Sequence, residues 1–325
     1  MSVPLLSVRT PATSANLGSG FDTLGMALSL YNLFEVTERL PEGEYRSEAI
    51  GEGALELADP GRNLVVRSYE IACRRFGVAG TGFALRSHNV IPLYRGLGSS
   101  AGAVVAGVLL AQELNGLTLP QEELLRTMVE IEGHPDNVAP CYLGGMVVSC
   151  WDGSELRTVR LPALPEDLLV VVAVPDVQVK TREARAALPE QVCFGDAVFT
   201  LGRAALLTAA WATGQWDLLA WGMDDRLHQP YRAKLFPGGE VIMDRVREIP
   251  GCLGVAISGS GPSVVALVKG RPRRVAETLC GTFSEHGVRS QFFVLDGNGS
   301  GAVVQRTFPF EKASSSQGVA SGGKG

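Results

Sequence analysis

The stretch PLYRGLGSSAG, from Pro92 to Gly102, has the composition of a phosphate-binding loop. Gly96 and Gly98 let the backbone approach an anion closely and adopt positive φ without a side-chain clash. Two serines follow, and residues 101–115 have good helical composition. A glycine turn that opens a helix directs N–H groups and the positive end of the helix dipole at a phosphate. The alternative interpretation is a purely structural turn.

The loop departs from two common nucleotide-binding motifs. It lacks the lysine of GxxxxGK[ST], so it is not an ordinary P-loop. It satisfies GxGxxA, a loose form of the dinucleotide fingerprint. However, no strand ending in an acidic residue follows about twenty residues later, and Pro92 interrupts the preceding strand. These departures disfavour a dehydrogenase built on this loop.

Two further stretches are dense in small and polar residues. The first, PATSANLGSGFDTLGMAL at 11–28, places Asn16 and Asp22 among glycines where a strand should turn. Taken alone, this stretch is as typical of a turn-rich β-hairpin as of a functional segment. The second, SGSGPS at 258–263, lies between two apolar strands. Alone, this second stretch predicts a tight hairpin turn.

The three stretches together, in this order, resemble the GHMP kinases, which phosphorylate small molecules. HPDNVAPCYLGG at 134–145 and HQPYRAKLFPG at 228–238 match the same family pattern. The resemblance runs from about Ser7 to about Val294. It implies that ATP is the phosphoryl donor and binds over the glycine loop. It also implies that Mg²⁺ is the cofactor and that the acceptor lies between two domains.

The acceptor is indicated by SANLGSGFDTLG at 14–25. This motif is similar to the branch of the family that phosphorylates the side-chain hydroxyl of L-homoserine to O-phospho-L-homoserine, in threonine biosynthesis. Mevalonate, shikimate and sugars lack an α-amino acid head, so a two-arginine clamp together with the SANLGSGFD motif argues against them. A noncatalytic member of the fold is disfavoured because Ser100, Glu130 and the glycine loop are intact.

The resemblance assigns ATP binding to Pro92, Leu93, Tyr94, Arg95, Gly96, Leu97, Gly98, Ser99, Ser100, Ala101 and Gly102. Gly102 stands where alanine is frequent in the family, which puts no function in doubt. The resemblance also points to Ser100 and Glu130 as ligands of Mg²⁺, which prefers hard oxygen donors. Glu132 is the alternative. The two carboxylates would face about 200° apart on a helix, so only one can point at the metal.

The amino-acid site implied by the resemblance consists of Asn16, Asp22, His134, Asn137, Thr181, Arg185 and Arg232. Asp22, Asn137 and Arg185 would be the catalytic residues among them. Arg185 and Arg232 would clamp the substrate carboxylate, because a guanidinium pairs with it bidentately; Arg182 is the alternative to Arg185. Asp22 would act as a general base or only orient the hydroxyl, since a loose transition state needs little deprotonation before attack. Residues 258–263 would support the ATP loop or approach the phosphates.

Composition limits the class of protein. The net charge of −5 and the lack of a basic tract argue against a nucleic-acid partner. Six cysteines form no CxxC pair, which suits reduced thiols in a cytoplasmic protein. No signal peptide or apolar run of membrane-spanning length is evident, so we expect no membrane partner. The family resemblance also implies a homodimer.

The predicted elements make this an α+β protein with the two-domain GHMP kinase fold. Strands are predicted at 5–10, 33–40, 82–91, 167–175, 253–258, 263–270 and 289–296. Helices are predicted at 63–76, 101–115, after Thr118, from Asp136, and at 196–213, 216–228, 240–249 and 272–286. We expect an ATP-binding domain at 1–165, a ferredoxin-like domain at 166–311 and a disordered tail at 312–325. The resemblance implies that the first domain shares the α+β fold of a ribosomal small-subunit protein, with an uncommon left-handed βαβ crossover.

Overall fold

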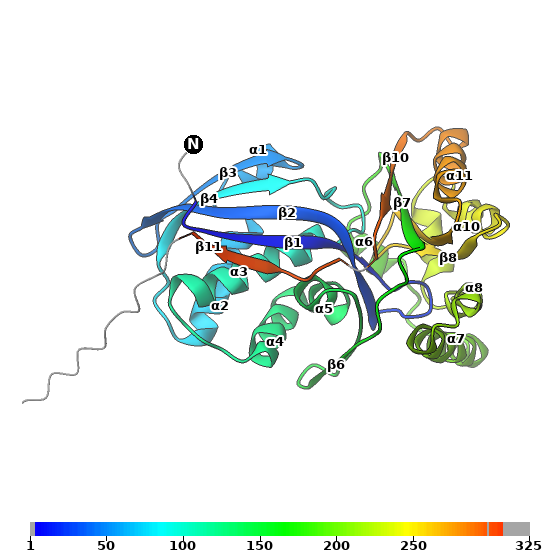
Figure 1. Cartoon of the computed structure of the whole chain (residues 1–325), viewed down its shortest axis with the longest axis horizontal. Helices are drawn as coiled ribbons and strands as arrows, with labels where there is room; N and C mark the ends of the chain where they lie inside the picture. Colours follow the sequence, from blue (N-terminus) through cyan, green and yellow to red (C-terminus); the bar gives the residue numbers. More distant parts are fainter. Residues whose placement is uncertain (1–3, 298, 308–325) are drawn as a thin grey trace, which may run out of the picture.

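The computed structural model describes residues 4–297 and 299–307, which form two β-sheets with helices packed on them (Figure 1). The first unit contains β1 (Leu6–Ala15), β2 (Leu24–Leu40), β3 (Tyr45–Gly51), α1 (Ala54–Leu57), α2 (Leu64–Phe76), β4 (Gly82–Asn89), α3 (Ser99–Leu114), α4 (Gln121–Glu132), α5 (Pro135–Leu143), β5 (Met146–Trp151) and β6 (Leu156–Arg160). The second contains β7 (Leu168–Pro175), α6 (Thr181–Ala186), α7 (Phe194–Thr213), η1 (Trp216–Leu218), α8 (Leu219–Gly222), α9 (Gln229–Arg232), η2 (Ala233–Leu235), α10 (Gly239–Arg247), β8 (Cys252–Ile257), β9 (Val264–Lys269), α11 (Pro272–Glu285) and β10 (Ser290–Leu295). A last strand, β11 (Val303–Arg306), returns to the first sheet.

The first sheet has the order β11-β1-β2-β4-β3, with β5 also paired to β2 and β6 paired to β5. Helices α2 to α5 cover one of its faces (Figure 1). Helix α3 is apolar on all sides and most of its residues are buried, so it runs through the centre of this core. Its N-terminus therefore has a fixed position relative to the sheet, and the glycine loop immediately precedes it.

The second sheet has the order β10-β7-β9-β8, and all its neighbouring strands are antiparallel. The chain order β7, helices, β8, β9, α11, β10 gives the strand arrangement of a ferredoxin-like unit. Helices α10 and α11 contribute to an apolar core that also includes residues of β7, β8 and β9. The α+β class and the ferredoxin-like second sheet are therefore confirmed.

A shared hydrophobic core joins the two sheets. Leu24 and Met26 of β2 belong to the same buried cluster as Val170 of β7 and Trp211 of α7. The Trp211 indole also donates a hydrogen bond to the carbonyl oxygen of Pro162, at 2.9 Å. Because apolar contact continues from one sheet to the other, the side chains that each sheet contributes to a site between them have defined relative positions.

The domain limits differ from the prediction at the C-terminal end. The ferredoxin-like unit was expected to extend over 166–311, but β11 pairs antiparallel with β1 of the first sheet. The chain therefore leaves the second sheet after β10 and closes the edge of the first. The expected disordered tail, 312–325, lies outside the described residues.

Local side-chain chemistry explains where the helix predictions were wrong. The helix predicted at 216–228 is interrupted, because the Asp225 carboxylate accepts hydrogen bonds from the backbone N–H groups of Leu227, His228 and Gln229. These bonds start the new helix α9 instead of continuing the old one. The helix predicted after Thr118 is α4, whose N-cap is Pro120. The helix predicted from Asp136 is α5, which begins one residue earlier, at Pro135.

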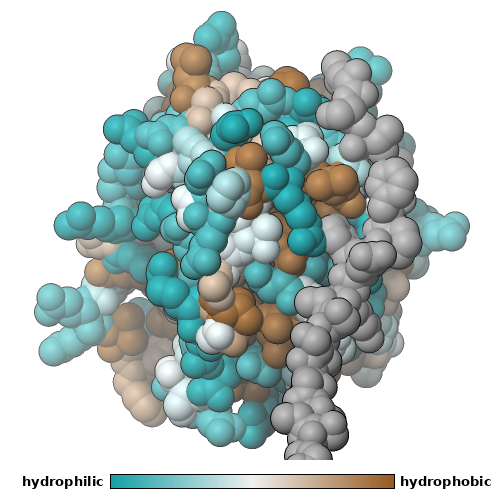
Figure 2. Space-filling model, turned by 90° about the vertical axis from the view of Figure 1, so that its left-hand side faces the viewer, coloured by the Kyte–Doolittle hydropathy of each residue, from teal (hydrophilic) through white to brown (hydrophobic). Residues whose placement is uncertain are grey.

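The surface at the first unit's outer end is largely hydrophilic. Figure 2 views this end, where hydrophobic residues occur in small groups separated by hydrophilic ones. Among residues 4–297 and 299–307, none of the helices combines the length and apolarity needed to span a bilayer.

Two helical glycines provide a matched test of the packing. A Cβ on Gly107 of α3 would lie 2.5 Å from the Val65 carbonyl oxygen of α2, whereas one on Gly281 of α11 would meet nothing within 4 Å. We predict that Gly107→Ala destabilises the fold by about 1–3 kcal/mol through overpacking. Gly281→Ala should stabilise it by about 0.5–1 kcal/mol through helix propensity. Denaturant unfolding of both variants measures this, and equal effects would contradict the close α2–α3 approach.

Candidate active site

The glycine loop forms the entrance to α3. Tyr94, Gly96 and Gly98 all have positive φ, at 56°, 73° and 67°. Gly98 is the N-cap of α3, and no side chain caps the helix. The first N–H groups of a helix lack intrahelical acceptors, so the first turn at Ser99 and Ser100 supplies donors beside the cavity that the loop lines. The geometry suits a phosphate.

The turn at 258–263 supports the loop from the second unit. Ser258 Oγ lies 2.7 Å from the Gly96 carbonyl oxygen and 2.9 Å from Ser14 Oγ, so it donates to the first and accepts from the second. A Cβ on Gly96 would lie 2.1 Å from the Ser258 carbonyl oxygen. Glycine is thus required there for both its φ and its close contact. Ser260 of the same turn lines the cavity.

The segment between β1 and β2 is held in an uncommon backbone conformation. Asn16, Leu17 and Asp22 have φ values of 72°, 47° and 56°. The side-chain amide of Asn16 holds the segment through two hydrogen bonds. Its Nδ2 donates to the Gly259 carbonyl oxygen at 2.8 Å, and its Oδ1 accepts from the Asp22 N–H at 3.0 Å. Such strain persists only where the surroundings determine it, and it is common at functional sites.

Asp22 and Arg185 form a bidentate ion pair across the two units. Arg185 Nη1 and Nη2 donate to the two carboxylate oxygens at 2.9 and 3.0 Å. The hydrogen bond to Asp22 raises the pKa of the Arg185 guanidinium. A guanidinium carries five N–H donors, so three remain for a substrate. Arg182, the sequence alternative, is not among the cavity residues.

Arg232 is a buried cation whose observed acceptors are both uncharged. Arg232 is 2% exposed and lines the cavity. Nη1 donates to the Gly259 carbonyl oxygen at 3.0 Å and Nε to that of Ala184 at 3.5 Å. Burial lowers the pKa of the guanidinium. A buried charge is costly unless an opposite charge pairs with it, so an anionic group in the cavity would stabilise Arg232.

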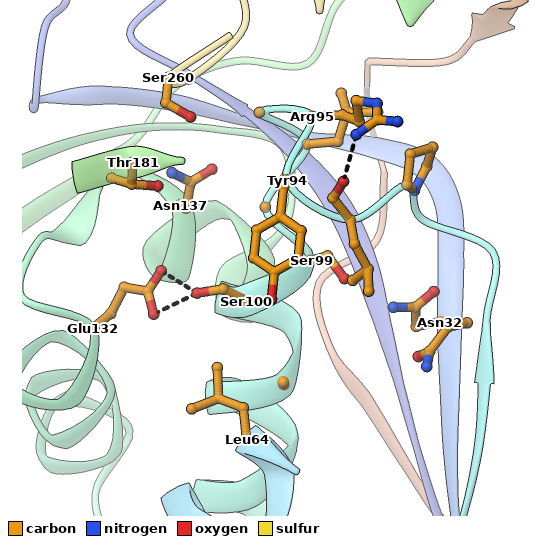
Figure 3. Close-up of a pocket in the computed structure, with 18 of the residues that line it drawn as sticks. Asn32, Leu64, Tyr94, Arg95, Ser99, Ser100, Glu132, Asn137, Thr181 and Ser260 are labelled. Carbon is orange, nitrogen blue, oxygen red and sulfur yellow. Dashed lines mark hydrogen bonds between the residues drawn. The ribbon is translucent and has the colours of Figure 1, made fainter. Parts of the chain in front are cut away.

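Ser100 and Glu132 bring two hard oxygen donors to the end of the phosphate loop. Ser100 Oγ lies 2.7 and 2.9 Å from the two Glu132 carboxylate oxygens (Figure 3). Burial raises the pKa of Glu132, although the hydrogen bond from Ser100 opposes this. Within the described residues, no group of three or more His, Cys, Asp or Glu side chains forms a metal site by itself.

The placement of Glu130 at the metal is corrected. Its carboxylate pairs with Arg75 at 3.1 Å and with Arg126 at 3.0 Å, and it is not among the cavity residues. Glu130 and Glu132 lie on different faces of α4, as a two-residue separation on a helix requires. The carboxylate that faces Ser100 is that of Glu132, the alternative considered from the sequence.

The HPDN motif lines the cavity beside the glycine loop. His134 Nδ1 lies 2.6 Å from Asp136 Oδ1. Burial opposes protonation of His134, but the hydrogen bond and charge of Asp136 outweigh it and raise its pKa. Asn137 Oδ1 accepts from Thr13 Oγ1 at 2.7 Å. This bond fixes the orientation of the amide and leaves Nδ2 as the donor end. A Cβ on Gly98 would lie 3.1 Å from Asn137 Oδ1, so the motif and the loop are in close contact.

One cavity of about 340 Å³ brings these groups together. The predicted residues that line it are Asn16, Asp22, Pro92, Leu93, Tyr94, Arg95, Gly96, Leu97, Gly98, Ser99, Ser100, His134, Asn137, Thr181, Arg185 and Arg232. Ala101 and Gly102 are buried in the first turn of α3 behind the loop. In Figure 3, Glu132, Asn137 and Thr181 lie on one side of Tyr94, and Asn32 lies on the other.

The cavity continues past Tyr94 into a part that the motifs did not identify. Asn32 lines it there, and Asn63, Leu64 and Ser87 are further lining residues of the same cavity (Figure 3). Asn32 Nδ2 and Ser87 Oγ are buried without a hydrogen-bond partner in the described structure. No motif marks either residue: Asn32 directly precedes the strand predicted at 33–40, and Ser87 lies within the strand predicted at 82–91. Asn63 is also the N-cap of α2, and its side chain accepts a hydrogen bond from the Val65 N–H.

The fold and site are those of a two-domain kinase for small molecules. Comparison with known proteins leads to the same class. Models of the GHMP kinases N-terminal domain and the GHMP kinases C-terminal region match residues 63–145 and 194–285. A homoserine kinase of Carboxydothermus hydrogenoformans is 42% identical, covering 92% of this chain and 96% of its own. One of Symbiobacterium thermophilum is 45% identical, with 92% and 94% covered. The crystal structure of a Cytophaga hutchinsonii homoserine kinase gives a TM-score of 0.79 at 30% identity, with 94% and 99% covered.

This chain belongs to the GHMP kinase family. Its identity to homoserine kinases extends over nearly the whole of both chains, so it includes both sides of the cavity. The sequence-based assignment to this family is therefore confirmed.

Glu130 and Glu132 of α4 provide a matched test of the metal position. We predict that Glu132→Gln lowers kcat about 100-fold, since charge stabilisation near a transferring phosphoryl group has this scale. Glu130→Gln should leave kcat within about twofold, because its partners are surface arginines. Steady-state kinetics over a range of Mg²⁺ concentrations measures both. A large loss in the Glu130 variant alone would return the metal role to Glu130.

The stability of the same variant tests the pKa of Glu132. Because the folded-state pKa is raised, the ionised carboxylate destabilises the fold at pH values above the ordinary carboxyl range. Glu132→Gln should therefore raise Tm at pH 7 without Mg²⁺. The gain should disappear as pH falls toward about 4, where the unfolded-state carboxyl also becomes neutral. An unchanged difference in Tm across this range would contradict the raised pKa.

Proposed function

We propose that this chain transfers the γ-phosphoryl group of ATP to the side-chain hydroxyl of L-homoserine, giving O-phospho-L-homoserine. The observation that carries the proposal is Arg232, a buried cation with only carbonyl acceptors in the same cavity as the phosphate loop. An acceptor with a carboxylate satisfies it, whereas a sugar does not. The whole-length identity to homoserine kinases supports the same acceptor.

The triphosphate of ATP is assigned to the glycine loop. The positive end of α3 and the first-turn N–H groups favour negative charge there. The nucleoside would then extend past Tyr94, toward Asn32 and Ser87, whose unpaired polar atoms can bond a base or ribose. Leu64 supplies apolar surface in the same cavity.

The residues around Ser100 fit a magnesium ion. Mg²⁺ uses one or two carboxylates together with substrate phosphates and water, and Glu132 with the Ser100 hydroxyl provides such a donor set. When bound, the ion neutralises charge on the phosphate oxygens. Ionised Glu132 is the form that serves this purpose, so its raised pKa sets an acid limit for activity.

The head of the amino acid is assigned to the two arginines and the strained segment. Arg232 would pair with the substrate carboxylate. Arg185 would donate hydrogen bonds to the same carboxylate from the N–H groups that do not bind Asp22. Asn16 and Asp22 would face the ammonium or the hydroxyl. Thr181 opens α6 at the cavity wall, where its hydroxyl can bond substrate or phosphate.

Asp22 is proposed to orient the acceptor hydroxyl rather than to remove its proton early. Both of its oxygens already accept hydrogen bonds from Arg185. A loose phosphoryl-transfer transition state requires little deprotonation before attack. Asn137 Nδ2 and the His134 ring, held by Thr13 and Asp136, are proposed to position the hydroxyl and the transferring group.

Cellular context is also proposed. The six cysteines are all free thiols, which agrees with a reducing compartment and hence a cytoplasmic location. Magnesium as the cofactor and a homodimeric assembly belong to the same proposal.

The function is tested by ADP release from the purified protein with MgATP and a panel of alcohols. The panel contains L-homoserine, L-serine, L-threonine, mevalonate, shikimate and galactose. We expect turnover with L-homoserine at a kcat/KM far above that of the others. Preferred turnover of mevalonate or galactose would contradict the proposed acceptor while leaving the kinase fold intact.

The arginine assignment is tested by single variants. Arg185→Ala and Arg232→Ala should raise the KM for L-homoserine about 10- to 100-fold, the scale of lost charge-assisted hydrogen bonds. The KM for ATP should stay within about twofold. Arg182→Ala is the matched control, because Arg182 lies on the same helix as Arg185 but outside the cavity. Equal changes in both KM values would place the arginines at the nucleotide instead.

A further inference from the structure

Two aromatic rings lie against the buried cation Arg232. The Phe21 ring stacks on the His228 ring, with the ring centroids 5.0 Å apart and an angle of 20° between the planes. The guanidinium carbon of Arg232 lies over the same Phe21 ring, 5.0 Å from its centroid. Arg232 lines the cavity, but Phe21 and His228 are not among its lining residues. Any effect of the two rings on a ligand must therefore pass through a residue that they contact.

His228 is held in place by its backbone and by its ring. It is buried and is the N-cap of α9. Its backbone N–H donates to the Asp225 carboxylate at 2.8 Å, and its carbonyl oxygen accepts from the Arg232 N–H at 3.0 Å. Its Nε2 lies 2.8 Å from the Gly18 carbonyl oxygen, which can only accept, so Nε2 carries the proton. The ring thus connects α9 to the segment between β1 and β2.

The imidazole of His228 is neutral. Its Nδ1 is buried and has no hydrogen-bond partner in the described structure. Burial lowers the pKa of His228; the negative charge of Asp225 opposes this without reversing it, and the positive charge of Arg232 adds to the lowering. The ring therefore stacks on Phe21 without placing a second positive charge beside Arg232.

The Phe21 ring is a third neutral partner of the Arg232 guanidinium. The other two are the carbonyl oxygens of Gly259 and Ala184, which accept from Nη1 and Nε. A cation over an aromatic face is attracted by the ring quadrupole, and the attraction is greater where water is excluded. Unlike a carboxylate, the ring does not neutralise the cation. Arg232 is thus held in position while its charge stays available to an anion.

We propose that the stacked rings of Phe21 and His228 form a platform that holds the Arg232 guanidinium where the acceptor carboxylate binds. The His228 ring is fixed by α9 and by Gly18, and the stack transmits this position to Phe21. Phe21 in turn contacts Arg232. The inference rests on the acceptor proposed above and adds two positioning residues that set the preference for its carboxylate. The alternative is that the rings only fill space between the two units.

The experiment compares L-homoserine with 3-amino-1-propanol, which has the same hydroxyl and amine but no carboxylate. For the wild-type protein we expect kcat/KM for L-homoserine to be at least about 100-fold higher, the scale of lost charge-assisted hydrogen bonds. Phe21→Leu keeps an apolar side chain but removes the ring face. It should lower kcat/KM for L-homoserine about 10-fold, and leave that for 3-amino-1-propanol and the KM for ATP within about twofold. A disturbance of the adjacent Asp22 would instead affect both alcohols equally.

Phe199→Leu is the matched control. Phe199 is half-buried, as Phe21 is, and it is not among the cavity residues. Its ring also faces cations, since the guanidinium carbons of Arg226 and Arg203 lie 3.9 and 4.7 Å from its centroid. The substitution therefore removes the same kind of contact away from the site. It should leave kcat/KM for both alcohols within about twofold, as expected for a half-buried contact outside the cavity. Circular dichroism verifies the folding of each variant.

A second variant tests whether the two rings act as one unit. His228→Gln keeps an N–H donor for the Gly18 carbonyl oxygen but removes the ring that stacks on Phe21. It should lower the ratio of the two kcat/KM values in the same direction as Phe21→Leu does. The double variant should lower this ratio by less than the product of the two single effects, because both substitutions remove the same platform.

The outcomes separate this inference from the proposed function. A wild-type protein that does not distinguish L-homoserine from 3-amino-1-propanol would overturn the proposed acceptor and the platform together. A strong wild-type preference that the folded Phe21→Leu variant retains would overturn the platform alone. Equal losses for the two alcohols, or fully multiplicative effects in the double variant, would also overturn the platform and leave the acceptor unaffected.

Discussion

The site depends on one contact between the two units: the Ser258–Gly261 turn against the glycine loop and the Asn16 segment. The Gly259 carbonyl oxygen accepts from both Asn16 and Arg232, and Ser258 Oγ bonds the loop at Gly96. One turn therefore positions the phosphate loop, the strained segment and the buried cation together. The two bonds to the Gly259 carbonyl oxygen are buried, so they are stronger than similar bonds at the surface. The shared apolar core beneath them keeps the two sheets in register.

Charge in the cavity is arranged for ligands rather than for stability. Arg232 is buried with only neutral acceptors, and the Glu132 carboxylate is buried with a raised pKa. In the absence of ligands, both groups destabilise the fold, since neither charge has an opposite charge in direct contact. A carboxylate at Arg232 and a metal ion at Glu132 would each relieve this cost. The same physical feature thus links ligand binding to the stability of the folded chain.

The motifs predicted the residues at the centre of the cavity, because these motifs contain residue types that particular backbone conformations require. Gly96 and Gly98 have the positive φ that their residue type indicated, and Arg185 lines the cavity as its sequence context implied. The choice between Glu130 and Glu132 as the metal ligand could not be made from helix spacing. Which face of a helix points at the site depends on the elements that pack against the helix. Asn32 and Ser87 escaped prediction because single polar residues in strands carry no motif. The return of β11 to the first sheet is a long-range pairing without a local signal.

The central claim is that phosphate and amino-acid sites share one cavity, with Arg232 at the amino-acid end. A crystal structure with Mg²⁺, L-homoserine and a nonhydrolysable ATP analogue tests it most directly. We expect the terminal phosphate at the first turn of α3, the substrate carboxylate on Arg232 and the hydroxyl directed at the terminal phosphate. A homoserine carboxylate bound away from Arg232, or a nucleoside lying on Arg232 in its place, would contradict it.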